Sequence, residues 1–244
     1  MSEWWGRPLA ETRWTAELAR LVVDPVFHGG RVPHGDGRPV LLAPGLGGGD
    51  QTLAVLALWL RRIGYRPHTA GFVANTGCSD RALERVERKA LALRRASGRR
   101  VALVGHSRGG HYARALAARR PQDVSHAISV GADLRRQVGI SRPTLYLVAV
   151  ARRGVQATHR ARAPGCLTPS CTCGFTRAFS APFPGDRVRL TSIYSKGDGV
   201  VAWQGAVVPE ADCVEVAGSH IGLVFNRKVY RAIAQALARP ELSG

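Results

Sequence analysis

The stretch that most constrains the fold covers residues 99–118, where a short apolar run, a tight turn and a helical pattern follow one another directly. The run over 101–104 is short and rich in valine, which predicts a buried strand. The turn over 105–109 reads Gly-His-Ser-Arg-Gly, a match to G-x-S-x-G. A serine on a sharp strand-to-helix turn has a strained backbone, and glycines beside it avoid collisions with neighbouring elements. Ser107 is therefore the candidate nucleophile.

Strand and helix patterns alternate along the rest of the chain, which predicts βαβ units and a parallel sheet. We expect an α/β fold with a mostly parallel central sheet of about six strands flanked by helices, in one domain over 1–244. The expected strands are 38–44, 65–73, 101–104, 124–130, 187–194 and 212–216, and the further expected helices are 51–62, 80–97 and 224–238.

The N-terminal region, 1–37, is expected to form an amphipathic helix over 4–23 followed by a loop. Such a helix normally buries its apolar stripe against the flank of the domain. The alternative is an interfacial helix that touches lipid, with Trp4 and Trp5 as an apolar anchor. The expected stripe consists of Trp14, Leu18, Leu21 and Val22.

Residues 133–187 interrupt the alternation of strands and helices and hold five prolines. An insertion of this size near a reactive serine predicts a cap or lid over the pocket. Within it, 144–151 is apolar over a length that fits either a helix or a strand.

The spacing of the cysteines does not indicate a zinc site. Cys166, Cys171 and Cys173 are spaced C-x4-C-x-C and lack the paired C-x-x-C or the nearby histidine pair that zinc sites use. Because no secretory signal precedes them, we expect free thiols, with a local disulfide as the alternative. Cys78 and Cys213 are expected to be small buried residues.

The net charge of +18 raises the question of nucleic-acid binding. Lysine occurs only at positions 89, 196 and 228, so arginine supplies nearly all of the basic residues, which indicates a GC-rich coding composition rather than a binding face. The arginines are also spread along the chain instead of clustering in a recognition motif. We therefore expect no nucleic-acid partner and keep contact with anionic lipid surfaces as an alternative.

The sequence has no apolar run long enough to span a bilayer. Its first residues are polar and lack the apolar core of a secretory signal. These two features predict a cytoplasmic protein.

A second glycine-rich segment, 45–49, follows the expected strand over 38–44. A P-loop would need Gly-Lys-Ser/Thr here, and a dinucleotide fingerprint would need glycine where Asp50 stands. The remaining interpretation is part of an oxyanion hole, with the Leu46 N–H as one donor. The second donor is the N–H of Arg108, at the N-terminus of the helix that follows the nucleophile.

Asp198 and His220 each stand in a glycine-flanked loop after an expected strand. Serine is a weak nucleophile unless an imidazole accepts its proton, and the imidazole needs a carboxylate to orient it. The order Ser107, Asp198, His220 matches one of the chain orders in which such triads occur. Asp133 also follows a strand and is the alternative acid.

The blocks GHSRGG, SIYSKGDGVV and GSHIGL resemble those of α/β-hydrolase fold esterases and lipases, in particular compact hydrolases of the actinobacterial type. The resemblance covers residues 38–238 and departs from the family pattern at Pro44-Gly45, where the family has histidine-glycine. It implies an α/β-hydrolase fold and a serine mechanism without cofactor or metal. The implied reaction is cleavage of small-molecule or lipid esters of carboxylic acids through an acyl-enzyme on Ser107. The alternatives are an acyltransferase or thioesterase with the same triad, or a non-enzymatic binding protein on the same fold.

Overall fold

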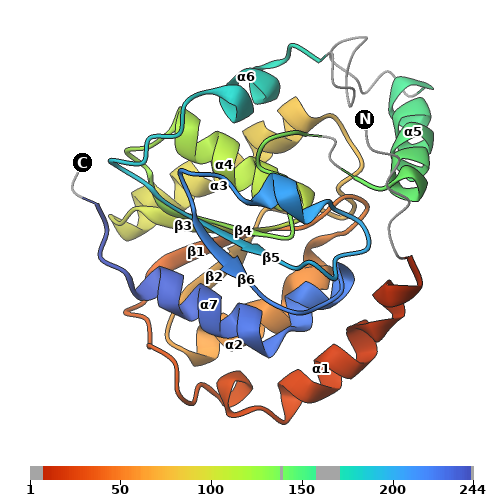
Figure 1. Cartoon of the computed structure of the whole chain (residues 1–244). Coiled ribbons are helices and arrows are strands. Elements are labelled where there is room, and N and C mark those ends of the chain that lie inside the picture. Colours follow the sequence, from red (N-terminus) through yellow and green to blue (C-terminus); the bar gives the residue numbers. More distant parts are fainter. Residues whose placement is uncertain (1–7, 138–139, 158–170, 243–244) are drawn as a thin grey trace.

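The six strands form one sheet in which every neighbouring pair is parallel. This computed structural model describes residues 8–137, 140–157 and 171–242 (Figure 1). The strand order is β2-β1-β3-β4-β5-β6, so the expected α/β sheet is confirmed and is parallel throughout. The strands are β1 (Pro39–Ala43), β2 (Arg66–Thr69), β3 (Val101–His106), β4 (Val124–Val130), β5 (Arg189–Tyr194) and β6 (Asp212–Glu215).

Alternating side chains of the central strands form two separate apolar cores, one on each face of the sheet. Val104 of β3 is in register with Leu42 on one side and Ile128 on the other, and these side chains belong to one core. Leu41 and Leu103, which are also in register, belong to the opposite core. Burial on both faces explains why these strands are continuously apolar in sequence.

Helices cover both faces of the sheet (Figure 1). The helices α2 and α7 pack on one face, while α3 and α4 pack on the other, where α6 lies on α4. Their bounds are α2 (Ala54–Arg62), α3 (Ser79–Ser97), α4 (Arg108–Arg119), α6 (Gly174–Ser180) and α7 (Arg227–Ala238). The described part of the chain also contains the 3-10 helices η1 (Pro8–Arg13), η2 (Pro25–His28), η3 (Asp50–Leu53), η4 (Trp203–Ala206) and η5 (Ile221–Phe225).

The predicted N-terminal helix is confirmed over 14–22, but its buried face differs from the prediction. The segment begins as the 3-10 helix η1 and continues as α1 (Trp14–Val22). Trp14 is 37% exposed and Val22 45%, whereas Leu21 is buried as predicted. Two carboxylates, Glu11 and Glu17, are buried in place of the rest of the stripe, because they accept backbone N–H groups from the rest of the fold. Trp4 and Trp5 lie outside the described residues.

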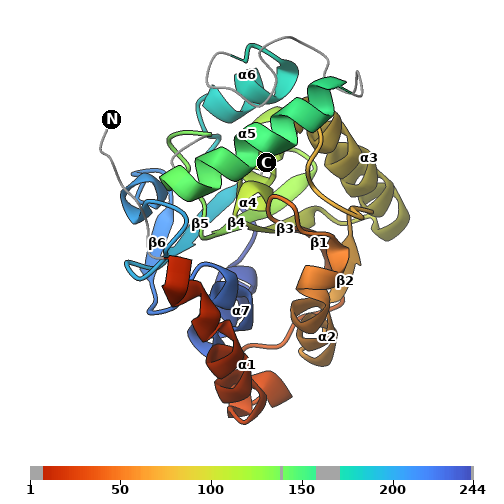
Figure 2. The same ribbon diagram turned by 90° about the vertical axis from the view of Figure 1, so that its right-hand side faces the viewer.

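The ambiguous stretch 144–151 is helical and belongs to α5 (Arg142–Ala157). In Figure 2, α5 runs across the front of the molecule. Ile140, just before α5, forms an antiparallel bridge with Val201 of the loop after β5. The insertion is therefore attached to a loop at the carboxyl end of the sheet. None of the helices in the described ranges is both long and apolar enough to cross a membrane.

The cysteines agree only in part with the sequence-based expectation. Cys171 and Cys173 are free thiols, and Cys78 is buried as predicted. The prediction for Cys213 is wrong, because it is exposed on β6, the edge strand of the sheet. Cys166 lies outside the described residues.

Burial strongly depresses the basicity of three of the histidines that the structure describes. It lowers the pKa of His106 and of His126 to about 3, with the Arg38 guanidinium adding to the effect at His126. It lowers the pKa of His111 to about 4. Below pH 6.5, the ordinary value, the unfolded chain therefore binds protons at rings that stay neutral in the folded chain. Folding stability must fall as the pH falls through this window.

We expect His126→Asn to weaken this pH dependence, because it removes one of the three rings. At pH 5 each such ring costs about 2 kcal/mol of stability. Urea unfolding followed by circular dichroism should show the wild type losing about 2 kcal/mol more than the variant between pH 7 and pH 5. An identical loss in both proteins would show that His126 is protonated in the folded state.

Candidate active site

The loops that carry the predicted site residues meet at the carboxyl edge of the sheet. Ser107 directly follows β3, and the glycine loop 45–49 follows β1, the neighbouring strand. Asp198 follows β5, and His220 follows β6. Because all strands are parallel, their carboxyl ends lie at one edge, which brings residues that are far apart in the sequence into one site.

Ser107 stands on a sterically enforced turn between β3 and α4. Its backbone has φ 52° and ψ −122°, a conformation that non-glycine residues rarely adopt. A side chain on Gly105 would lie 2.1 Å from the carbonyl of Gly109, and one on Gly109 would lie 2.0 Å from the carbonyl oxygen of Ala43. The turn therefore requires the glycines of the motif, and the strain at Ser107 is held by the packing around it.

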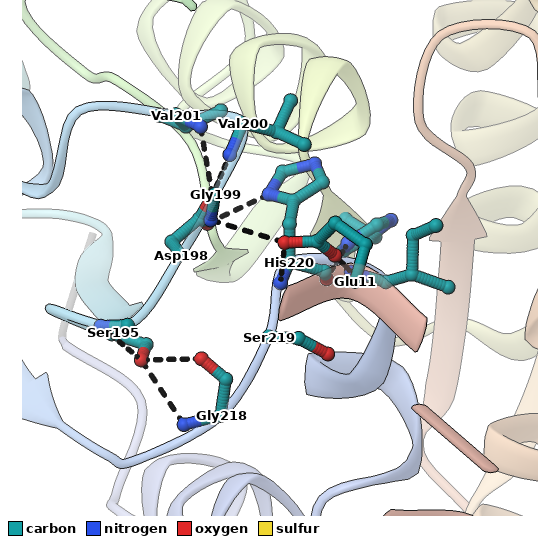
Figure 3. A network of polar contacts seen from close by, with 12 residues as sticks. Glu11, Ser195, Asp198, Gly199, Val200, Val201, Gly218, Ser219 and His220 are labelled. Carbon is teal, nitrogen blue, oxygen red and sulfur yellow. Dashed lines mark hydrogen bonds and ion pairs between the residues drawn. The ribbon is translucent and has the colours of Figure 1, made fainter. Parts of the chain in front are cut away.

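Asp198 and His220 form a buried hydrogen-bonded pair. The Nδ1 of His220 lies 2.7 Å from Oδ2 of Asp198 (Figure 3). The other oxygen of Asp198 accepts from the N–H groups of Val200 and Val201 at 2.8 and 2.7 Å, which holds the carboxylate in place beside the imidazole. The pair leaves Nε2 of the neutral ring as its unprotonated nitrogen.

The alternative acid, Asp133, is committed elsewhere. Its Oδ1 accepts from the N–H groups of Arg135 and Arg136, both at 2.8 Å. Its carboxyl group also packs so closely on Gly205 that a side chain there would collide with it. Burial raises the pKa of Asp133, although the two N–H groups oppose this. The structure pairs His220 with Asp198 and not with Asp133.

A second histidine, His106, contacts both the main chain and the ring of His220. Its Nε2 lies 3.0 Å from the carbonyl oxygen of His220, and the two rings are 4.9 Å apart. Burial lowers the pKa of His106 to about 3, and the neighbouring His220 adds to this. His106 is therefore neutral at physiological pH, and it donates to the main chain that carries the reactive ring.

The glycine loop is held against the nucleophile by a buried asparagine that the sequence analysis missed. Asn75 donates from Nδ2 to the carbonyl of Pro44 at 2.9 Å, and its own carbonyl accepts from Gly47 at 3.2 Å. Its Oδ1 accepts from the hydroxyl of Tyr112 at 3.0 Å and from Arg108 at 3.3 Å. Asn75 thus joins the glycine loop to α4, the helix that begins behind the nucleophile.

The side chain of Arg108 is buried and holds the same region together. It donates to the carbonyls of Asn75 and Gly77 at 2.9 and 2.7 Å and to the hydroxyl of Ser79 at 2.9 Å. Because Arg108 is the first residue of α4, its own backbone N–H is among those that have no acceptor within the helix. The side chain thus has a structural role, while the N–H remains available to an anion.

Ser107, Leu46 and His220 line one cavity of about 710 Å³. This volume lies within the range of sites for small organic ligands. Its other lining side chains are apolar and polar in equal number, and the apolar ones come mainly from α1, the insertion, the loop after β5 and the segment after His220. They include Trp14, Ile140, Phe175, Val201, Ile221 and Phe225. The residues described here include no group of three His, Cys, Asp or Glu side chains that could hold a metal ion.

Comparison with known proteins gives a fold and no close relative. No family model matches the sequence, and no curated protein matches it. The mature Bacillus licheniformis lipase superposes with a TM-score of 0.58, covering 85% of this chain and 94% of the lipase, at 15% sequence identity. Paleococcus ferrophilus monoacylglycerol lipase superposes with a TM-score of 0.56, covering 84% of this chain and 96% of that chain, also at 15% identity.

A thioesterase domain from the curacin biosynthetic pathway is also similar in fold. It superposes with a TM-score of 0.55, covering 84% of this chain and 92% of the domain, at 17% identity. The structural neighbours thus include lipases, esterases and a thioesterase, at identities that show the fold alone. The predicted α/β-hydrolase fold is confirmed.

We expect Asn75→Ala to destabilise the protein, because the change removes the buried hydrogen bonds that the Asn75 side chain forms with the Tyr112 hydroxyl and the Pro44 carbonyl. The free energy of unfolding in urea should fall by about 2–3 kcal/mol. Ser125→Ala is the matched control, since it removes a buried hydroxyl that has no hydrogen-bond partner among the described residues. It should change stability by less than about 0.5 kcal/mol. Equal effects of the two changes would contradict the bracing role of Asn75.

Proposed function

We propose that the protein is a serine hydrolase that cleaves carboxylic esters through an acyl-enzyme on Ser107. One observation carries this proposal: the strained Ser107 and the His220 held by Asp198 face the same apolar cavity. A serine in a simple tight turn would need neither the backbone strain nor a carboxylate-bound imidazole beside it. The lipase and esterase neighbours support ester hydrolysis at the level of the fold.

The acylation step uses the triad residues in the following roles. Nε2 of His220 accepts the proton of the Ser107 hydroxyl while Oγ attacks the ester carbonyl. Asp198 accepts from Nδ1–H and stabilises the imidazolium that forms. The tetrahedral intermediate collapses when the imidazolium gives its proton to the leaving alkoxide, so that the alcohol departs and the acyl group stays on Ser107.

The oxyanion and the deacylation step complete the cycle. The backbone N–H groups of Leu46 and Arg108 stabilise the negative oxygen of both tetrahedral intermediates. In deacylation His220 accepts a proton from water, the resulting hydroxide attacks the acyl carbon, and the carboxylic acid is released as Ser107 regains its proton. The original Ser107 proton leaves with the alcohol, a proton from water replaces it, and no cofactor is consumed.

The substrate class follows from the cavity. Its apolar lining suits an acyl chain, so we assign small-molecule esters with an apolar acyl group, including lipid esters, as substrates. Thr144 of α5 and Phe175 of α6 both line the cavity, which supports the assignment of 133–187 as a cap over the site.

An acyltransferase or thioesterase is the second candidate, and the thioesterase neighbour favours it. Either would use the same acyl-enzyme, with an alcohol or thiol replacing water or a thioester replacing the ester. Product analysis with an added acceptor alcohol separates transfer from hydrolysis. A non-enzymatic binding protein on this fold would hydrolyse neither ester nor thioester.

We expect Ser107→Ala and His220→Ala each to abolish hydrolysis of p-nitrophenyl butyrate, and the double variant to lose little more. Triad residues act as one unit, so their losses do not multiply. Asp198→Asn should lower kcat by about 10⁴-fold, since the imidazole would be held in the wrong tautomer. Steady-state kinetics on folded variants measures all of these effects.

Asp133→Asn is the matched control for the acid, because Asp133 was the alternative and has a different set of partners. It should keep kcat within about threefold of the wild type. Greater damage from Asp133→Asn than from Asp198→Asn would assign the acid to the loop after β4. A folded Ser107→Ala variant with wild-type turnover would overturn the nucleophile.

The apolar cavity predicts a preference for longer acyl chains. Each buried methylene contributes about 0.8 kcal/mol, so kcat/KM should rise by up to about fourfold per methylene until the cavity is filled. A series of p-nitrophenyl esters from acetate to dodecanoate measures this slope. Phe175→Ala in the cap should change the length at which the rise ends and leave the acetate value nearly constant. A flat series would exclude the cavity as the acyl site.

A further inference from the structure

We propose that Glu11 is a positioning residue, assisted by Glu17, which locks the His220 loop to the Asp198 loop. The inference rests on the proposed function, since it deepens the account of the same site. Both carboxylates lie on the N-terminal segment, and each is only 8% exposed. Both are distant in sequence from the loops that they contact: 209 residues separate Glu11 from His220, and 202 residues separate Glu17 from Ser219.

With one carboxylate, Glu11 joins the loop that carries Asp198 to the loop that carries His220. Its Oε1 accepts from the N–H groups of Gly199 and His220, both at 3.0 Å, and its Oε2 accepts from Ile221 at 2.8 Å (Figure 3). Gly199 is the residue directly after Asp198. One side chain is thereby bonded to the main chain next to the acid and to the main chain of the base itself.

Glu17 extends the same bracing by one residue. It accepts from the N–H and the hydroxyl of Ser219 at 2.9 and 3.0 Å. A side chain on Gly222 would lie 1.2 Å from Oε2 of Glu17, so the glycine leaves the space that this carboxylate fills. Three consecutive N–H groups, those of residues 219, 220 and 221, therefore donate to the two glutamates.

These N–H groups need such acceptors. They stand at the beginning of η5, where the first amides of a helix have no acceptor in the helix itself. Buried N–H groups without a partner are costly, and a carboxylate forms stronger hydrogen bonds than a neutral acceptor does. An apolar residue at position 11 would leave the main chain of His220 without this partner.

The site depends on this brace because the strand before His220 is a weak support. The edge strand β6 has only four residues, Asp212–Glu215, three of which are exposed. The 2.7 Å bond between Asp198 and His220 nevertheless requires two loops from different strands to be held in register. A misplacement of about 1 Å in a catalytic group can cost 100-fold in rate. A carboxylate that bonds both loops removes this freedom.

The test is Glu11→Gln, which replaces one acceptor oxygen by an NH2 group that cannot accept. On p-nitrophenyl butyrate, kcat should fall about 10- to 100-fold while KM changes less than about threefold. The far-downfield proton resonance of His220 Nδ1–H should broaden or vanish, while the rest of the NMR spectrum remains that of the folded protein. General destabilisation would lower the melting temperature without removing this resonance from the folded molecules.

Asp24→Asn is the matched control, since it makes the same carboxylate-to-amide change on the same N-terminal segment. Asp24 is also buried, but it pairs with Arg227 and Arg231 of α7 at 3.0 and 2.6 Å, away from the triad. This variant should lose stability and keep both kcat and the downfield resonance. If Glu11→Gln behaves in the same way as Asp24→Asn, the proposal is overturned.

Two further outcomes are decided in advance. If Glu11→Gln does not fold, Glu17→Gln applies the same test at smaller amplitude, with an expected fall in kcat of about three- to tenfold; wild-type kcat in that variant would overturn the proposal. If the wild-type protein hydrolyses no ester, the proposed function fails. The downfield resonance in wild type, Glu11→Gln and Asp24→Asn then decides the positioning role by itself.

Discussion

The close crossing of β3, α4 and β1 at Ser107 is the constraint on which the rest of the site depends. Because Gly109 touches the Ala43 carbonyl, the loop that leaves β1 must begin beside the nucleophile, and this places Leu46 at the cavity. The strained backbone at Ser107 costs of the order of 1–3 kcal/mol, which the two buried faces of the sheet can offset. The packing that forms the core thereby also places Leu46, the proposed oxyanion donor, at the same cavity as the serine.

The sequence predicted those parts of the molecule whose signals are local. The turn at Ser107, the glycine loop and the two later loops can each be recognised from about ten residues of sequence, since a tight turn demands particular residue types. The parallel sheet followed from the alternation of strands and helices, and it then required the loops to meet at one edge. The stretch 144–151 could not be assigned, because a short apolar run fits a strand or a helix and only its neighbours decide between them.

The sequence could not predict contacts between distant segments. A stripe drawn from apolar residues includes Trp14 and Val22 and leaves out Glu11 and Glu17, yet the structure buries the two carboxylates and exposes the two apolar side chains. The reason is that unpaired backbone N–H groups at the start of η5 outweigh apolar burial at this place, and no periodicity in the first twenty residues can report them. The role of Asn75 could not be predicted for the same reason, since its partners come from the loop after β1 and from α4.

Part of the arginine excess has a structural role, because some guanidinium groups are hydrogen-bonded within the fold. Arg100 donates to the carbonyls of Pro121, Val124, Arg187 and Leu242, and Arg108 donates to three residues of the single stretch 75–79. A planar group with five donors can join several loop ends, which the compact ammonium of lysine does less well. Guanidinium groups whose donors are already hydrogen-bonded in this way are not available to bind phosphates. The net charge of +18 therefore overstates the basic surface available to a polyanion, and the cavity, rather than the charge, is the feature from which a substrate should be inferred.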